Sequence, residues 1–454
     1  MKGFKIHKTL RYSLGFLLGL SLVTYVPLSD RWPSGFGIAV AQDEGGSEEQ
    51  KTTKVSGINA KTYEKFAEAS ELFEAENYSG ALAILDEIKG KKKLSSAEAI
   101  QLYSFYGVVY FSQENYKKSI QAFESMLAQP ELEERQRAET LYTLAQLHFT
   151  IEDWQGAIDI MKDWLATVDN PPPEPFILLA SAYYQMEKYQ EMIQPIERAM
   201  EIARARDDEI KEQWYLLLRV AYYELGDLKQ VARILEVLVV NWPKKEYWTM
   251  LSGMYGELNQ EAKQLAAYES AYDQGLLVDG KELVALSQLL LQGEAPYKSA
   301  RVLEKGFEAG VIEKTESNYR LLSQAWQLAA EYEKAIPPLK QAANISDDGE
   351  LDVRLANSYL NLRRYDECVE ASRAGLNKGG LKRDGAAYEL LAMCLFEKEK
   401  YEDSKEAFRK AAKDESIAKR ARNWIKFIDT EQSRIAQLNE SIKQARLARE
   451  ALSN

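Results

Sequence analysis

Residues capable of acid–base, nucleophilic or metal chemistry are scarce in this chain of 454 residues. Only two histidines occur, His7 and His148, and His148 lies in a column that other parts of the chain fill with large apolar residues. A single histidine beyond the first residues cannot supply a multi-histidine metal site and leaves little scope for a histidine-dependent triad. We therefore interpret His148 as a packing residue and expect no catalytic residue, cofactor or metal.

Carboxylates are plentiful, but their grouping favours solvated helix ends over a site. Typical groups are Glu131, Glu133 and Glu134, and Asp207, Asp208 and Glu209, which lie in or beside expected turns. No glycine-rich phosphate loop follows a strand pattern, and Gly379-Gly380 indicates the end of a helix. A transferase acting on sugars or peptides through a cryptic site is kept as a third functional hypothesis.

The two cysteines, Cys368 and Cys394, fall in adjoining segments of the repeat described next. Both stand where other repeats place small residues. Free cysteine often serves simply as a small core residue, so two buried thiols are the favoured interpretation. A disulfide is the alternative, and it would require an oxidising compartment.

The elements that position these residues recur along the chain. At a spacing of 33 to 39 residues, an aromatic or apolar residue is followed three places later by a small or apolar one, and the sixth member is degenerate. The members are Tyr78/Ala81, Tyr116/Ser119, Trp154/Ala157, Tyr189/Met192, Leu228/Val231, Glu261/Gln264, Tyr297/Ala300, Tyr332/Ala335, Tyr365/Cys368 and Tyr401/Ser404. Such a period is typical of helix pairs that bury their apolar faces only by stacking on neighbours.

The columns of the repeat resemble the tetratricopeptide repeat, as Leu144, Ala145, His148, Trp154 and Ala157 illustrate. The family's terminal proline is matched at few places. The resemblance implies an all-α, right-handed superhelical solenoid of about ten helix pairs over residues 61–413, with a capping helix and helical tail over residues 414–454. It also implies no internal domain boundary.

In the repeat that this chain resembles, the residue eight places before each small position faces a concave, peptide-binding groove. A row of rings occupies that position here, namely Phe73, Phe111, Phe149, Tyr184 and Tyr223. The alternative is that the rings complete the core. Groove-edge positions are acidic, at Glu139, Glu174, Glu246, Glu282 and Glu350. We expect a partner with a basic or proline- and lysine-rich segment.

The start of the chain differs from the rest. Four basic residues precede an apolar run from about Ser13 to Val26, and Ala39-Val40-Ala41 offers a cleavage site. This order predicts a signal peptide over residues 1–41 and export to the periplasm, with an uncleaved inner-membrane anchor as the alternative. Residues 42–60 are expected to form a flexible acidic leader.

Charge limits the class of partner. The net charge is −12, and residues 1–41 hold five basic and one acidic residue, so their removal leaves −12 − 4 = −16. Phosphate backbones and anionic lipid should repel such a protein, which disfavours nucleic acid and direct lipid binding.

The whole layout is similar to the exported tetratricopeptide proteins that accompany TonB, ExbB and ExbD in gamma-proteobacteria. That resemblance implies an accessory role in TonB-dependent uptake. A scaffold for cell-envelope or cell-wall assembly is the alternative. The sequence leaves the oligomeric state open, although Ile435, Leu438, Ile442, Ala445 and Leu452 form a short heptad-like stripe near the end.

Overall fold

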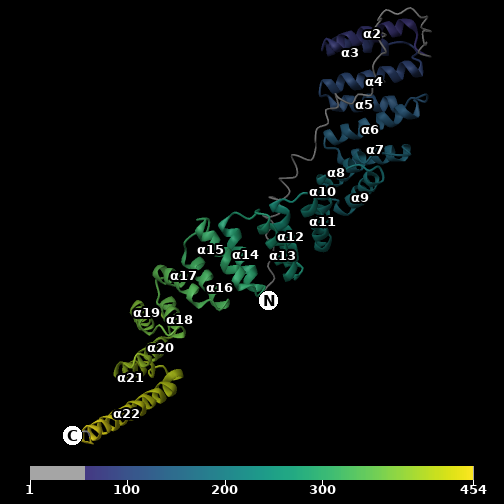
Figure 1. Cartoon of the computed structure of the whole chain (residues 1–454). Coiled ribbons are helices and arrows are strands. Elements are labelled where there is room, and N and C mark those ends of the chain that lie inside the picture. Colours follow the sequence, from purple (N-terminus) through teal and green to yellow (C-terminus); the bar gives the residue numbers. More distant parts are fainter. Residues whose placement is uncertain (1–56, 453–454) are drawn as a thin grey trace, which may run out of the picture. The chain divides into compact units, whose positions relative to one another are not determined.

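The computed structural model describes residues 57–452, together with the side chains up to residue 449. The predicted signal peptide and most of the predicted leader lie outside the described residues. Within the described part all regular secondary structure is helical, which confirms the predicted all-α class of stacked helix pairs (Figure 1). No described helix has an apolar segment long enough to cross a bilayer.

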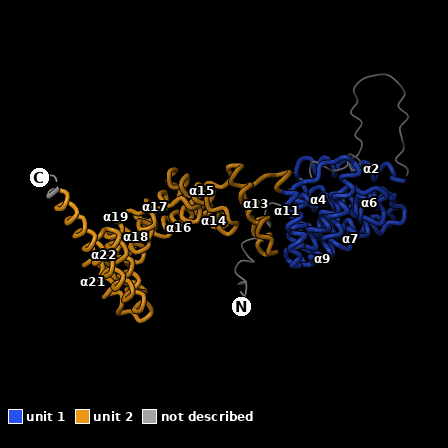
Figure 2. Tube along the Cα trace, turned by 60° about the horizontal axis from the view of Figure 1, so that its bottom comes forward, with its two compact units in different colours: residues 1–238 blue, residues 239–454 orange. Residues whose placement is uncertain are grey.

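The helices group into two compact units, one ending at Leu238 and the other beginning at Val239 (Figure 2). The repeat period gave no sign of this division, and one continuous solenoid over residues 61–413 stays a prediction. Unit 1 contains α2 (Ala60–Glu74), α3 (Tyr78–Lys89), α4 (Ser96–Ser112), α5 (Tyr116–Leu127), α6 (Glu134–Thr150), α7 (Trp154–Thr167), α8 (Glu174–Gln185), α9 (Tyr189–Ala205) and α10 (Glu212–Glu224). The boundary falls within α11 (Leu228–Asn241).

Unit 2 continues the same alternation of first and second helices. It contains α12 (Lys245–Glu257), α13 (Glu261–Asp273), α14 (Gly280–Gln292), α15 (Pro296–Glu308), α16 (Glu316–Leu328), α17 (Tyr332–Ile345), α18 (Glu350–Asn361), α19 (Tyr365–Lys378), α20 (Asp384–Glu397), α21 (Tyr401–Ala411) and α22 (Glu415–Leu452). Its core is a series of clusters, one around Leu303 and Trp326 and another that reaches from Ile336 to Ile428. Stacking therefore lengthens the unit without enlarging any single core.

The turns inside the pairs share one geometry, which explains why the second helices begin at the predicted aromatic column. Two residues before each second helix the backbone is left-handed, for example at Glu114 (φ 56°) and Glu152 (φ 61°). The next residue often caps the helix, as Asn115 does by accepting a hydrogen bond from the N–H of Lys118. A residue in the left-handed conformation ends the first helix, because the turn that it makes lets backbone N–H groups hydrogen-bond to the last carbonyl groups of that helix.

Gly226 occupies the left-handed position of its turn, and this gives a stability prediction. Its φ is +76°, and a Cβ there would meet nothing within 4 Å. We expect Gly226→Ala to lower stability by about 1 kcal/mol, because the cost is purely conformational. Gly253, inside α12 and equally open, is the matched control. Gly253→Ala should raise stability by about 0.5–1 kcal/mol. Urea unfolding measures both, and changes of the same sign would contradict the assigned turn geometry.

The cysteines correct one interpretation made from the sequence. Cys368 on α19 and Cys394 on α20 form a disulfide, with their Cα atoms 6.0 Å apart, so the favoured free thiols are wrong. Adjoining helices of successive pairs bring the two positions within bridging distance. Both residues are fully buried, as the small-residue columns led us to expect.

A buried carboxylate joins the first two pairs of unit 1. Glu98 on α4 is only 3% exposed and accepts hydrogen bonds from the Thr62 hydroxyl (2.7 Å) and the Asn59 amide (2.6 Å) at the start of α2. It also accepts from the backbone N–H of Ser95 (3.1 Å), which completes a capping box at the start of α4. The Nζ of Lys91 lies 3.8 Å away.

Candidate protein-binding site

Three consecutive first helices of unit 1 present the face on which the sequence placed a groove. On α6 the positions i, i+3, i+7 and i+10 carry Glu139, Tyr142, Gln146 and Phe149, and all four are half-buried. The equivalent residues are Glu174, Ile177, Ser181 and Tyr184 on α8, and Gln213, Leu216, Val220 and Tyr223 on α10. We call these three rows the α6–α8–α10 face.

The predicted acids and rings share this face but lie at its opposite ends. Ten residues separate Glu139 from Phe149, and ten separate Glu174 from Tyr184. At 1.5 Å per residue, the two ends of each row are about 15 Å apart. A ligand that touches both must therefore extend along the helices, while a compact group reaches only one end.

Four of the five rings pack within their own helix pair. Each contacts the aromatic residue that begins the second helix, and the centroid distances are 5.6 Å for Phe73–Tyr78, 5.7 Å for Phe111–Tyr116, 4.8 Å for Phe149–Trp154 and 6.4 Å for Tyr184–Tyr189. These rings pack the two helices of a pair together at the turn. Each of the four rings is only half-buried, so part of its surface stays open to solvent. Their role in binding stays a prediction.

Tyr223 differs from the other rings of the row. The second helix of its pair begins with Leu228 instead of an aromatic residue, and the Tyr223 side chain is 42% exposed. An exposed tyrosine at the end of a half-buried row offers a ligand both a ring face and a hydroxyl. Tyr223 is therefore the ring of the row that is most open to a ligand.

The acids of the face are paired within the chain. Glu139 lies 3.0 Å from Arg135 of the same helix, and Glu174 lies 3.5 Å from Lys211 at the start of α10. In unit 2, Glu282 pairs in the same way with Lys245 at 3.0 Å. Exposed ion pairs of this kind contribute little to stability, so a basic ligand can replace the internal cation at small cost.

Tyr184 adds a hydrogen-bond donor to the face. Burial raises the pKa of its hydroxyl, and the negative charge of Glu224, one pair further along, raises the pKa again. The hydroxyl therefore stays protonated at neutral pH and can donate to a carbonyl of a bound chain.

His148 makes a polar contact that the sequence did not predict. Its Nδ1 lies 2.7 Å from Oδ2 of Asp153, which also caps α7 by accepting from the N–H of Gly156. That hydrogen bond and the contact with His148 lower the pKa of Asp153. A Cβ at Gly156 would come within 2.5 Å of both polar groups, so a larger residue at this position would displace the contact between His148 and Asp153. Within residues 57–452, no group of three or more His, Cys, Asp or Glu side chains could hold a metal ion.

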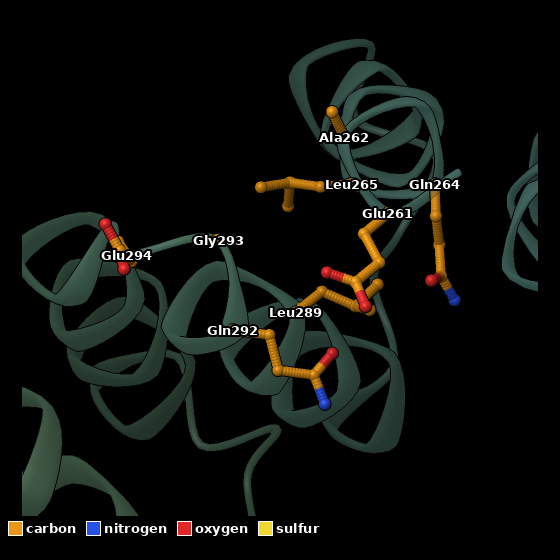
Figure 3. A pocket seen from close by; sticks show the side chains of 8 residues that line it. All are labelled: Glu261, Ala262, Gln264, Leu265, Leu289, Gln292, Gly293 and Glu294. Atoms are coloured by element: carbon orange, nitrogen blue, oxygen red, sulfur yellow. The ribbon is translucent and has the colours of Figure 1, made fainter. Parts of the chain in front are cut away.

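Unit 2 contains a cleft of about 390 Å³ that was not predicted from the sequence (Figure 3). It lies between α13 and α14 and is lined by Glu261, Ala262, Gln264, Leu265, Leu289, Gln292, Gly293 and Glu294. A signal was present, because Glu261 and Gly256 stand at the two positions that form a ring contact in other pairs. Without those rings the turn end of the pair is less filled.

The comparisons with known proteins support the repeat assignment. The sequence model of the Tetratricopeptide repeat family matches residues 173–206 and 385–413, which lie within one helix pair of each unit. No curated protein matches the chain.

Several solved structures that resemble parts of the chain are described as TPR or tetratricopeptide repeat proteins. The TPR2AB-domain:pHSP90-complex of yeast Sti1 has a TM-score of 0.33 and 15% identity, and the match covers 57% of this chain and 97% of that one. YrrB, "a TPR protein with an unusual peptide-binding site", has a TM-score of 0.34 and 17% identity over 41% of this chain and 96% of that one. A tetratricopeptide repeat protein from Parabacteroides merdae has a TM-score of 0.32 and 14% identity over 66% and 99%.

Proposed function

We propose that this tetratricopeptide repeat protein is a periplasmic scaffold for protein–protein interaction and an accessory component of a TonB-dependent energy-transduction and uptake system. The observation that carries the binding part is the α6–α8–α10 face. Half-buried apolar residues lie along its middle on α8 and α10, Glu139 and Glu174 begin two of its rows, and Tyr223 is open. Tetratricopeptide repeat proteins generally bind other proteins.

The chemistry of the face favours an extended basic segment. Ile177, Leu216 and Val220 supply half-buried apolar surface that a proline ring or a lysine stem can cover. Lysine ammonium groups can take the places of Arg135 and Lys211 beside Glu139 and Glu174. A polyproline-like chain is also already extended, so it loses little conformational entropy on binding.

A matched set of variants tests the binding part. We expect a synthetic peptide of alternating proline and lysine to bind the full chain, and Tyr223→Ala to weaken binding about tenfold, as loss of an exposed aromatic anchor does. Glu174→Lys should also weaken binding, and the difference should shrink as salt is added. Tyr332→Ala and Glu201→Lys are controls, because both residues are exposed and lie on second helices.

Fluorescence anisotropy at low and physiological ionic strength provides the measurement. The proposal would be contradicted if the control variants lost as much affinity for the peptide as the test variants, or if the wild type showed no salt-dependent binding of the peptide.

Export is supported by two features. The basic and apolar start of the chain has the order of a signal peptide, and disulfides persist mainly in oxidising compartments such as the periplasm. Amino-terminal sequencing of protein from a periplasmic extract should find Gln42 first. Recovery of TonB, ExbB or ExbD with the tagged protein tests the transport role, and recovery of cell-wall machinery alone would contradict it.

A further inference from the structure

The last helix of unit 2, α22, is far longer than its packing requires. It spans 38 residues, whereas the second helix that precedes it, α21, spans only 11 (Figure 1). Ile417, Ala421 and Ile428 are at most 1% exposed against the preceding helices. The hydrogen bonds that join α21 to α22 among the described residues end at Gln432, which contacts Lys405 and Glu402. About 30 Å of helix follows that point.

The face that α22 buries continues along this extension as an exposed stripe. We assign Ala421 to position a of a seven-residue repeat labelled a to g. Trp424 then occupies position d and Ile428 the next position a, and both lie in the packed half of the helix. The same positions carry Ile435, Leu438, Ile442 and Ala445 in the extension, where Leu438 is 49% and Ile442 58% exposed. The stripe is thus continuous with an established helix–helix interface and leaves apolar side chains in solvent.

We propose that this stripe pairs with the same stripe of a second copy of the chain, in an antiparallel two-helix coiled coil centred on Glu440. Residues equally far from Glu440 meet in such a pair. Ile442 then packs on Leu438 of the second copy, and Ile435 packs on Ala445 of the second copy. The arrangement closes as a two-fold dimer, because each contact occurs twice.

Charge selects the antiparallel orientation. Glu431 occupies a d position and Arg449 an a position of the same heptad register, both nine residues from Glu440. In an antiparallel pair each Arg449 meets Glu431 of the other copy. A parallel pair would place Arg449 against Arg449 and Glu431 against Glu431, and like charges at facing positions are destabilising. Glu431 also pairs with Arg434 of its own helix, so Arg449 joins an existing ion pair.

Sedimentation equilibrium of the full chain over a concentration series tests the proposal. We expect a reversible dimer for the wild type and at least a hundredfold weaker association for Ile442→Glu. Leu447→Glu is the matched control, because Leu447 is 57% exposed on the same helix but lies off the stripe. The Ile442→Glu protein should keep its helical circular dichroism, since the side chain is exposed. A monomeric wild type, or equal effects of the two substitutions, would overturn the proposal.

Cross-linking tests the orientation. Cys368 and Cys394 are bonded to one another. A disulfide between two copies of the chain can therefore be attributed to the introduced cysteines. A mixture of Arg434→Cys and Ala448→Cys proteins should give a disulfide between the two variants on air oxidation. Both residues occupy g positions of the same register, and g positions of the two helices flank the same side of an antiparallel pair. Efficient cross-linking of Arg434→Cys protein to itself would overturn the antiparallel arrangement.

Discussion

Replacing Glu98 by alanine is expected to lower the stability of the first helix pairs by about 3 kcal/mol. The buried Thr62 hydroxyl loses its acceptor, and Lys91 loses its counter-ion. An unsatisfied buried donor costs about 1–3 kcal/mol, and removing one partner of a buried ion pair costs about 3–5 kcal/mol. The Lys91 side chain is 27% exposed, so the expected loss of stability lies at the lower end of the range for buried ion pairs.

The lower stability of the Glu98→Ala protein should appear as faster amide hydrogen exchange in α2 and as unfolding at a lower urea concentration. Glu98→Gln should cost less, because the amide oxygen still accepts a hydrogen bond. Glu124→Ala, an exposed substitution in the same unit, should stay within about 0.5 kcal/mol. Unchanged exchange in α2 of the Glu98→Ala protein would show that the carboxylate does not hold these pairs together.

The contribution of Glu98 depends on pH in a defined direction. Burial raises its pKa, but the hydrogen bonds from Thr62, Ser95 and Asn59 and the charge of Lys91 together lower it below the ordinary value of 4.5. A lowered carboxyl pKa gives stability that is present above the unfolded pKa and lost as the pH falls through the folded pKa. The stability difference between wild type and Glu98→Gln should therefore shrink on acidification below about pH 4.

Reduction of the Cys368–Cys394 disulfide is the second large expected effect. The bond closes a loop over a sequence separation of 26 residues, for which loop-closure entropy gives about 3.5 kcal/mol. Unfolding of unit 2 should shift to lower urea concentration after treatment with a thiol reductant. Unit 1 contains no cysteine and serves as the internal control.

Peptide mass mapping without reduction decides whether the bond exists in the purified protein. A cross-linked pair of peptides containing Cys368 and Cys394 is expected. Two alkylatable thiols, or a urea transition of unit 2 that reduction leaves unchanged, would contradict the stabilising disulfide.

The repeat period predicted the helices well, because local chemistry sets both ends of each turn. Tyr78, Tyr116 and Trp154 each begin a second helix where the aromatic column placed them. The residue two places earlier is left-handed in each case, and a capping Asn or Asp precedes the ring. These signals lie within a few residues of one another in the sequence.

Features that depend on distances between helices were not predictable in the same way. The pairing of Glu174 with Lys211 joins successive first helices, and the disulfide joins successive pairs. The period gives the register of such residues but not their separation in space. The contact of Phe149 with Trp154 likewise follows from side-chain direction at the turn, which a row of rings in the sequence does not encode.

Hydrogen–deuterium exchange of the full chain, with and without the proline- and lysine-containing peptide, tests the central claim most directly. The peptide should slow exchange in α6, α8 and α10, most clearly around Tyr223, and leave α16 to α19 unchanged. Protection confined to other helices, or none at a peptide concentration that saturates anisotropy, would contradict binding at the α6–α8–α10 face.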